Sequence, residues 1–155
     1  MAEAEWMDEA FRLAEEAGRA GEIPIGAVVV DAEGRIIGRG RNVREAGDPL
    51  GHAEILAIGE AARAMGDWRL TGTTMVVTLE PCAMCAGAIV NARIDRLIFA
   101  APDPKAGFCG SLGNLVQDPR LNHRVELIGG FGEARSRELL QTFFQELRRR
   151  KFAPP

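Results

Sequence analysis

Residues 75–92 read MVVTLEPCAMCAGAIVNA, and this stretch decides the fold class. Residues 75–79 form a short apolar run typical of a buried strand, and Pro81 ends it because proline cannot donate to a strand ladder. Residues 82–92 are rich in small side chains and predict a closely packed helix. Residues 95–101 follow as another apolar strand. This alternation of strand and helix predicts an α/β protein with a largely parallel sheet.

The flanking sequence continues the alternation in both directions. Helices are predicted over 6–20, 52–65 and 133–151, a β-hairpin over 25–31 and 35–41, and a last strand over 124–128. We expect the core-facing positions of the first two helices to be Trp6, Ala10, Leu13, Ala14 and Ala17, and then Ile55, Ile58 and Ala62. Residues 102–122 form a long irregular stretch with space for one short helix, and 153–155 a loose tail. Helices should therefore cover both faces of the sheet.

Length and composition predict a single domain over residues 1–155. The chain has three cysteines, and an odd number argues against a disulfide framework. We find no apolar run long enough to span a bilayer, so no membrane partner is expected. The acidic N-terminus lacks the charged-then-apolar layout of a signal peptide. A cytoplasmic protein is therefore the expectation.

The charge is unevenly distributed along the chain. The net charge of −3 counts weakly against nucleic acid as a partner. Acidic residues gather in the first 22 residues, whereas Arg148, Arg149, Arg150 and Lys151 form a basic cluster near the end. Such a cluster marks either a polyanion-binding edge or the solvated C-terminal end of a helix, where cations are favourable.

Three metal-binding side chains stand at the starts of two predicted helices. His52 opens one helix, and Cys82 and Cys85 open the next, where their spacing puts both thiols on one face of the first turn. The positive end of the helix dipole favours the thiolate, which is the form that binds metal. Each helix follows a strand or loop of the sheet, so we expect both helix starts to meet at one edge, where α/β sheets place their ligands.

The number of ligands distinguishes the kinds of zinc site. His52, Cys82 and Cys85 make three, and a fourth ligand from Cys109 or His123 would give a closed structural site. With only three, the fourth position holds water, whose pKa zinc lowers towards about 7.

Glu54 stands two residues after His52, where it is free to carry protons. The two cysteines could instead form a structural zinc half-site, a thioredoxin-like redox pair or two buried thiols. Glu54 could instead be a solvated carboxylate at the start of a helix. A redox role leaves the His52-x-Glu54 start unexplained.

The motif His52-x-Glu54 with Pro81-Cys82-x-x-Cys85 resembles the signature of the zinc nucleobase deaminases. The likeness covers nearly the whole chain and includes Asp48-Pro49, residues 77–88, Gly110-Ser111-Leu112, Asn122-His123-Arg124-Val125-Glu126 and Phe143-Phe144. The segments at 123–125 and 143–144 are similar to the tRNA-acting branch of that superfamily. The resemblance implies a three-layer α/β/α cytidine-deaminase-like fold with a mostly parallel five-stranded sheet, one Zn²⁺ per chain and a homodimer.

The resemblance also implies hydrolytic deamination of adenosine to inosine at the wobble position of a tRNA anticodon stem-loop. Zinc-bound hydroxide would attack the base and Glu54 would shuttle protons. Asn42 would hold the flipped base, and Asp103 would contact the neighbouring sugar. We expect further substrate contacts from Phe144, by stacking on a base, and from Arg148, by its charge. Either Phe143 or Phe144 is expected to belong to the core of the last helix instead.

Three rival functions remain open at this stage. A deaminase of free guanine or cytosine would share every catalytic residue, and the basic C-terminal helix and residues 122–124 argue against it. A non-catalytic, zinc-stabilised RNA-binding module would have no use for Glu54 beside an open metal position. A redox protein would show activity that follows cysteine oxidation and not zinc content.

Overall fold

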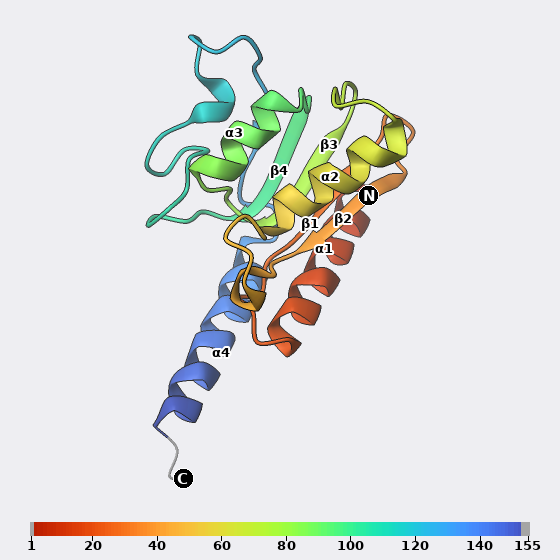
Figure 1. Ribbon diagram of the computed structural model, residues 1–155. Helices are drawn as coiled ribbons and strands as arrows, with labels where there is room; N and C mark the ends of the chain where they lie inside the picture. Colours follow the sequence, from red (N-terminus) through yellow and green to blue (C-terminus); the bar gives the residue numbers. More distant parts are fainter. Residues whose placement is uncertain (1, 153–155) are drawn as a thin grey trace.

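The computed structural model describes residues 2–152 as a central sheet between layers of helices (Figure 1). The strands are β1 (Gly26–Val30), β2 (Ile36–Arg41), β3 (Thr74–Leu79), β4 (Arg96–Ala101) and β5 (Glu126–Ile128). The helices are α1 (Ala2–Arg19), α2 (Ala53–Met65), α3 (Ala83–Asn91) and α4 (Glu133–Lys151), with short 3-10 helices η1 (Arg44–Ala46) and η2 (Leu115–Gln117). The order and type of these elements agree with the prediction, although α1 begins four residues before Trp6. The tail expected at 153–155 lies outside the described residues.

The five strands form one mixed sheet in the order β2-β1-β3-β4-β5. β3 pairs in parallel with β4, and β4 in parallel with β5, but β1 is antiparallel to both of its neighbours. Four strands therefore run in one direction and β1 runs against them. The predicted α/β fold class is confirmed, with the correction that only half of the strand pairings are parallel. The tight turn after β1 causes this, because a short hairpin joins antiparallel strands.

The two faces of the sheet bury separate hydrophobic clusters. Alternate residues of β1, β3 and β4 point to opposite faces, as the pleat of a strand requires. One face packs against α2 and α3 through Ala27, Val29, Met75, Val77, Leu97 and Phe99. The other packs against α1 through Val28, Val30, Val76, Ile98 and Ala100, with Leu139 of α4 at its border. The molecule thus has three layers, helix on sheet on helix (Figure 1).

Glycines in β2 let α2 lie unusually close to the sheet. A Cβ atom on Gly40 would lie 2.1 Å from the carbonyl oxygen of Ala53, and one on Gly38 would lie 2.2 Å from that of Ala57. The fully buried face of α2 is accordingly made of the small residues Ala53, Ala57 and Ala61. The predicted stripe of Ile55, Ile58 and Ala62 is only half-buried. Ile58 and Ala62 of this stripe do pack against the core cluster. The prediction missed the fully buried positions because it followed hydrophobicity, whereas the close contact with β2 selects small side chains.

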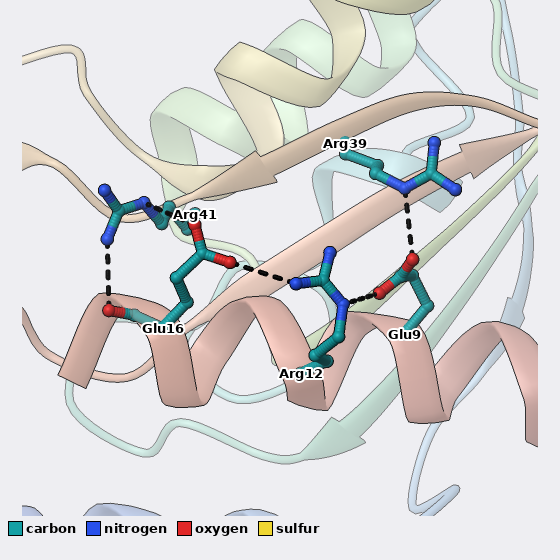
Figure 2. Close-up of polar contacts among 5 residues, drawn as sticks. All are labelled: Glu9, Arg12, Glu16, Arg39 and Arg41. Atoms are coloured by element: carbon teal, nitrogen blue, oxygen red, sulfur yellow. Dashed lines mark hydrogen bonds and ion pairs between the residues drawn. The ribbon is translucent and has the colours of Figure 1, made fainter. Parts of the chain in front are cut away.

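Ion pairs join α1 to β2, which is an edge strand of the sheet. Figure 2 shows Arg12 between Glu9 and Glu16, at 3.0 Å from the Glu16 carboxylate. Arg39 of β2 donates to Glu9 at 3.1 Å, and Arg41 donates to the backbone carbonyl of Glu16 at 3.0 Å. Charged side chains on an edge strand discourage pairing with another strand. Because all of these side chains remain partly exposed to solvent, we expect each pair to contribute little to stability.

Candidate active site

The three predicted metal ligands lie together where two helices begin. His52 is the N-cap of α2, Cys82 is the N-cap of α3, and Cys85 lies in the first turn of α3. The His52 Nδ1 atom is 3.6 Å from Cys82 Sγ and 3.5 Å from Cys85 Sγ. The carboxyl end of β3 leads directly into the Cys82 segment, which brings the two helix starts to one edge of the sheet.

The spacing of these three atoms fits a tetrahedral zinc ion. Zinc bonds of about 2.3 Å to sulfur and about 2.0–2.1 Å to nitrogen, at a tetrahedral angle, place the two ligand atoms about 3.6 Å apart. Among the described residues, the metal-binding group contains His52, Cys82 and Cys85, but neither Cys109 nor His123. The His123 ring lies 2.7 Å from the carbonyl oxygen of Ile94 instead. Three protein ligands leave a coordination position for a reactant, which is the arrangement of catalytic zinc sites.

The two thiols have pKa values shifted in opposite directions. A hydrogen bond from Cys85 lowers the pKa of the Cys82 thiol to about 5, against the opposing effect of burial. Donating that bond, together with burial, raises the pKa of the Cys85 thiol. The pair therefore carries one thiolate at neutral pH, and a cation between the sulfurs would favour the second.

Glu54 is a buried carboxylic acid beside the metal-binding group. Its side chain is 5% exposed in the first turn of α2, two residues after His52. Burial raises the pKa of Glu54 to about 7, and the neighbouring Cys82 acts in the same direction. A carboxyl group with a pKa near neutrality can both accept and donate a proton at physiological pH.

A cavity of about 410 Å³ opens beside Glu54. It is lined by Ile23, Ile25, Asn42, Arg44, His52, Ala53, Glu54, Leu79, Glu80, Cys82, Pro102, Asp103, Pro104, Lys105, Ala106, Leu140 and Phe144. The wall is mostly apolar, with a few convergent polar groups, as is usual for a site that binds a small planar molecule. Its charged residues are two cations, Arg44 and Lys105, and three acids, Glu54, Glu80 and Asp103.

The structure brings most of the predicted site residues to this cavity. Asn42, Asp103 and Phe144 line it with His52, Glu54 and Cys82, whereas Cys85 is buried behind the cavity wall. Arg148 lies outside, in a neighbouring groove of about 390 Å³. Lys105, Leu140 and Phe144 line both spaces, so the groove continues the cavity along α4.

Asn42 has its amide partly engaged at the cavity wall. Its Nδ2 atom donates to the carbonyl oxygen of Ile23 at 3.3 Å, and its Oδ1 atom accepts from the backbone N–H of Arg44 at 3.1 Å. An amide has two N–H donors and two acceptor lone pairs, so one of each is still available for a ligand. These bonds fix the orientation of the side chain.

One sequence expectation about the aromatic residues of the last helix was wrong. Neither Phe143 nor Phe144 belongs to a core cluster: Phe143 is half-buried and Phe144 is 37% exposed, and their rings meet edge to face at 5.4 Å. Both residues belong to α4, which projects from the body of the molecule (Figure 1). The segment 122–124 contacts the end of β4 opposite the cavity, through the His123 bond to Ile94, and is not part of the cavity wall.

Sequence reasoning missed Glu80, which also lines the cavity. Burial alone would raise the pKa of its carboxyl, but hydrogen bonds from Ser111, Asp103 and Cys109 outweigh burial and hold that pKa below its ordinary value. The sequence did contain a signal: Glu80 lies between a buried strand and the Pro81-Cys82 pair, a position at which we would not expect a solvent-exposed acid.

Comparison with known proteins identifies relatives of the whole chain. The model of the MafB19-like deaminase family matches residues 1–148. The tRNA-specific adenosine deaminase of Bacillus subtilis (strain 168) is 48% identical over 149 residues, which cover 96% of this chain and 92% of that protein.

Solved structures agree with this relationship. A structure from a study of A-to-I editing by tRNA:A34 deaminases at the wobble position of transfer RNA has a TM-score of 0.83 and 43% identity, over 88% of this chain and 99% of that one. A guanine deaminase from Bacillus subtilis is more distant, with a TM-score of 0.62 and 31% identity over 98% of this chain and 96% of that one.

Proposed function

This chain belongs to the family of the tRNA-specific adenosine deaminases, and from that premise we propose that it converts adenosine to inosine at the wobble position of a tRNA anticodon. The observation that carries the proposal is the position of Glu54, a buried acid beside a three-ligand metal-binding group on the wall of an open cavity. A purely structural zinc site would have four protein ligands and no need of such an acid.

The reaction replaces the amino group at C6 of adenine by oxygen from water and releases ammonia. A C–O bond forms and a C–N bond breaks, so protons must leave the water and reach a ring nitrogen and the departing amine. We infer that Glu54 accepts the proton from water and returns it to the base: it lines the cavity beside the metal-binding group, and a pKa of about 7 allows both steps at neutral pH. Its burial keeps bulk water from competing for these protons.

His52, Cys82 and Cys85 would hold a zinc ion at the wall of this cavity. When bound, zinc would act as a Lewis acid and supply activated water for the hydrolysis at neutral pH. The chain's contribution is to hold two sulfurs and one nitrogen at a spacing that suits zinc, at the starts of two helices.

Residues of the cavity wall would bind the base and its neighbours. We infer that Asn42 meets the edge of the flipped adenine with its remaining N–H and acceptor, and that Asp103 lies beside the sugar. Phe144 is exposed at the junction of cavity and groove, where a neighbouring unpaired base can stack on it. Arg148 then meets the backbone phosphates farther along α4.

The direct test uses an anticodon stem-loop with adenosine at the wobble position. Incubation with the zinc-loaded protein should yield inosine at that position, read by sequencing, and no inosine at other adenosines. Ammonia release from free guanine or cytosine is the matched assay for the alternative function, a free-base deaminase. Activity on free bases without activity on the stem-loop would overturn the proposal.

A homodimer and a cytoplasmic location stay predictions. Light scattering after gel filtration should give twice the chain mass if the protein dimerises, and fractionation of cells would test the location. Among the helices of residues 2–152, none has both the length and the hydrophobicity needed to cross a membrane.

A further inference from the structure

We propose that Glu80 is a positioning residue: its buried carboxylate holds the loop at 102–112 beside the Cys82 end of the cavity, and thereby shapes the wall against which the substrate binds. The inference rests on the proposed function for its substrate. It concerns a carboxylate that takes no part in the chemical steps, and it explains what holds the long irregular loop in place.

Both oxygens of the Glu80 carboxylate are occupied by the loop. Oε1 accepts hydrogen bonds from the backbone N–H of Asp103, at 2.9 Å, and from the Ser111 hydroxyl. Oε2 accepts from the backbone N–H groups of Cys109 and Ser111, at 3.0 Å each. These bonds bind the two ends of the segment 103–111 to one side chain that is 3% exposed.

The loop fits closely around this carboxylate. A Cβ atom on Gly107 would lie 2.3 Å from Glu80 Oε2, so only glycine leaves room there. The backbone N–H of Phe108 donates to the carbonyl oxygen of Pro81 at 2.9 Å, and Gly107 pairs with Cys82 in an isolated antiparallel bridge. The loop is therefore attached to the chain segment that carries the first cysteine of the metal-binding group.

The position of the loop affects the substrate site because residues of the loop form part of the cavity wall. Asp103, Pro104, Lys105 and Ala106 line the cavity, and Lys105 also lines the groove along α4. Without the carboxylate, three backbone N–H groups lose their acceptor: that of Cys109 is buried, and those of Asp103 and Ser111 are partly buried. The loop must move to find other acceptors for them. Because Glu80 has all its bonds committed to the loop, it does not serve as a second proton carrier beside Glu54.

The first test is the variant Glu80→Gln, which keeps the shape of the side chain but turns an N–H₂ group towards N–H donors. We expect faster amide hydrogen exchange at Asp103, Cys109 and Ser111, with unchanged exchange in α2. For the stem-loop substrate, KM should rise about tenfold or more, as expected for losing hydrogen bonds to a charged group, while kcat and zinc content stay near those of the unaltered protein.

Two further variants should give smaller changes in hydrogen exchange and in KM than Glu80→Gln. Glu80→Asp keeps the charge but is shorter, and should restore part of the exchange protection and of KM. Ser111→Ala removes the hydroxyl donor alone and should have the smallest effect. Should Glu80→Gln fail to fold, the same measurements on Glu80→Asp and Ser111→Ala decide the question.

Hydrogen exchange needs no substrate, so it separates this inference from the proposed function. Unaltered exchange at the loop amides in the folded variants would overturn the positioning role, whether or not the protein edits tRNA. A loss of kcat with unchanged KM and unchanged exchange would overturn it too, since Glu80 would then act in the chemistry.

Discussion

Glu54 and Glu80 are two acidic residues that line the same cavity, but their surroundings shift their pKa values in opposite directions. For Glu54, burial outweighs the hydrogen bonds that favour its charged form, and its pKa is raised to about 7. Glu80 is equally buried, but hydrogen bonds from the loop hold its pKa below the ordinary value. One acid can therefore exchange protons at neutral pH, and the other stays ionised as an acceptor for backbone N–H groups.

Replacing Glu54 tests the proton carrier. We expect Glu54→Ala to lower kcat by about 10⁴-fold, the upper end of the usual range for a positioned acid–base group, because one group would serve successive proton transfers. Zinc content and stem-loop affinity should stay close to the unaltered values, because Glu54 is not a ligand. Glu60→Ala is the matched control, since Glu60 is exposed on the same helix. Zinc loss in the Glu54 variant would instead make that residue a ligand.

Removing one sulfur tests the metal site. Cys82→Ala should lose most of its zinc, measured by metal analysis per chain, and should unfold at a lower temperature, because metal binding contributes to folding free energy. Cys109→Ala is the control: this thiol is more buried than that of Cys82, but it lies outside the three-ligand group. Equal zinc content in the two variants would contradict the assignment.

The contact of α2 with β2 shows how elements position the site. Gly38 and Gly40 allow the backbone of α2 to lie directly on β2, and that helix has His52 as its N-cap and Glu54 in its first turn. On the other face, Gly26 plays the same part, because a Cβ atom there would lie 2.0 Å from the carbonyl oxygen of Ala10. Small residues at these contacts determine the distance between the layers.

A single methyl group should disturb this contact. Gly40→Ala places a Cβ atom against the Ala53 carbonyl, so we expect the free energy of unfolding to fall by about 1–3 kcal/mol, as in overpacked cores. Because Ala53 lies between His52 and Glu54, deamination should fall as well. Both effects are measured by urea unfolding and by inosine formation.

Gly59→Ala is the control for that variant. Its Cβ atom would be in ordinary contact with the Arg63 side chain at 3.5 Å, within the interior of α2. Replacing a helical glycine by alanine should raise the free energy of unfolding by roughly 0.4–1 kcal/mol. Destabilisation of the same size in both variants would show that the close contact with β2 is not the cause.

At the scale of the whole molecule, the acidic N-terminal segment and the basic C-terminal segment lie far apart in the sequence, but ion pairing brings parts of them together. Arg135 of α4 pairs with Asp8 of α1 at 2.8 Å, while the far end of α4 projects from the body with its basic residues (Figure 1). There Arg149 and Arg150 both pair with Glu146. Within residues 2–152, Arg148 forms no ion pair and lines the groove that continues the cavity. A net charge of −3 is thus compatible with a local site for a polyanion.

This difference between neighbouring arginines predicts their effect on RNA binding. Arg148→Ala should weaken binding of the stem-loop and reduce its salt dependence by about one slope unit, as expected for one lost phosphate contact. Arg149→Ala should have a smaller effect, because Glu146 already neutralises that side chain. Fluorescence anisotropy at several salt concentrations measures both. If Arg148→Ala leaves affinity and slope unchanged, this part of α4 is only a solvated helix end.

The amino-acid sequence by itself determined the elements and the metal-binding group. Alternating apolar runs, Pro81 and the small residues after it were enough to predict β3 and α3, because those signals are local. His52, Cys82 and Cys85 were recognisable for the same reason: their spacing places them at the starts of two helices. Glu54 followed from its distance of two residues from His52.

Only the tertiary structure decided what depends on contacts between distant residues. Glu80 meets partners 23 to 31 residues away, and no periodicity in the sequence encodes those bonds. The buried face of α2 depends on glycines in another element, and His123 lies at the end of β4 away from the cavity although its segment resembles that of tRNA-acting relatives. Hydrophobicity and spacing describe one element at a time, whereas close approach and hydrogen bonding of a loop depend on how elements come together in space.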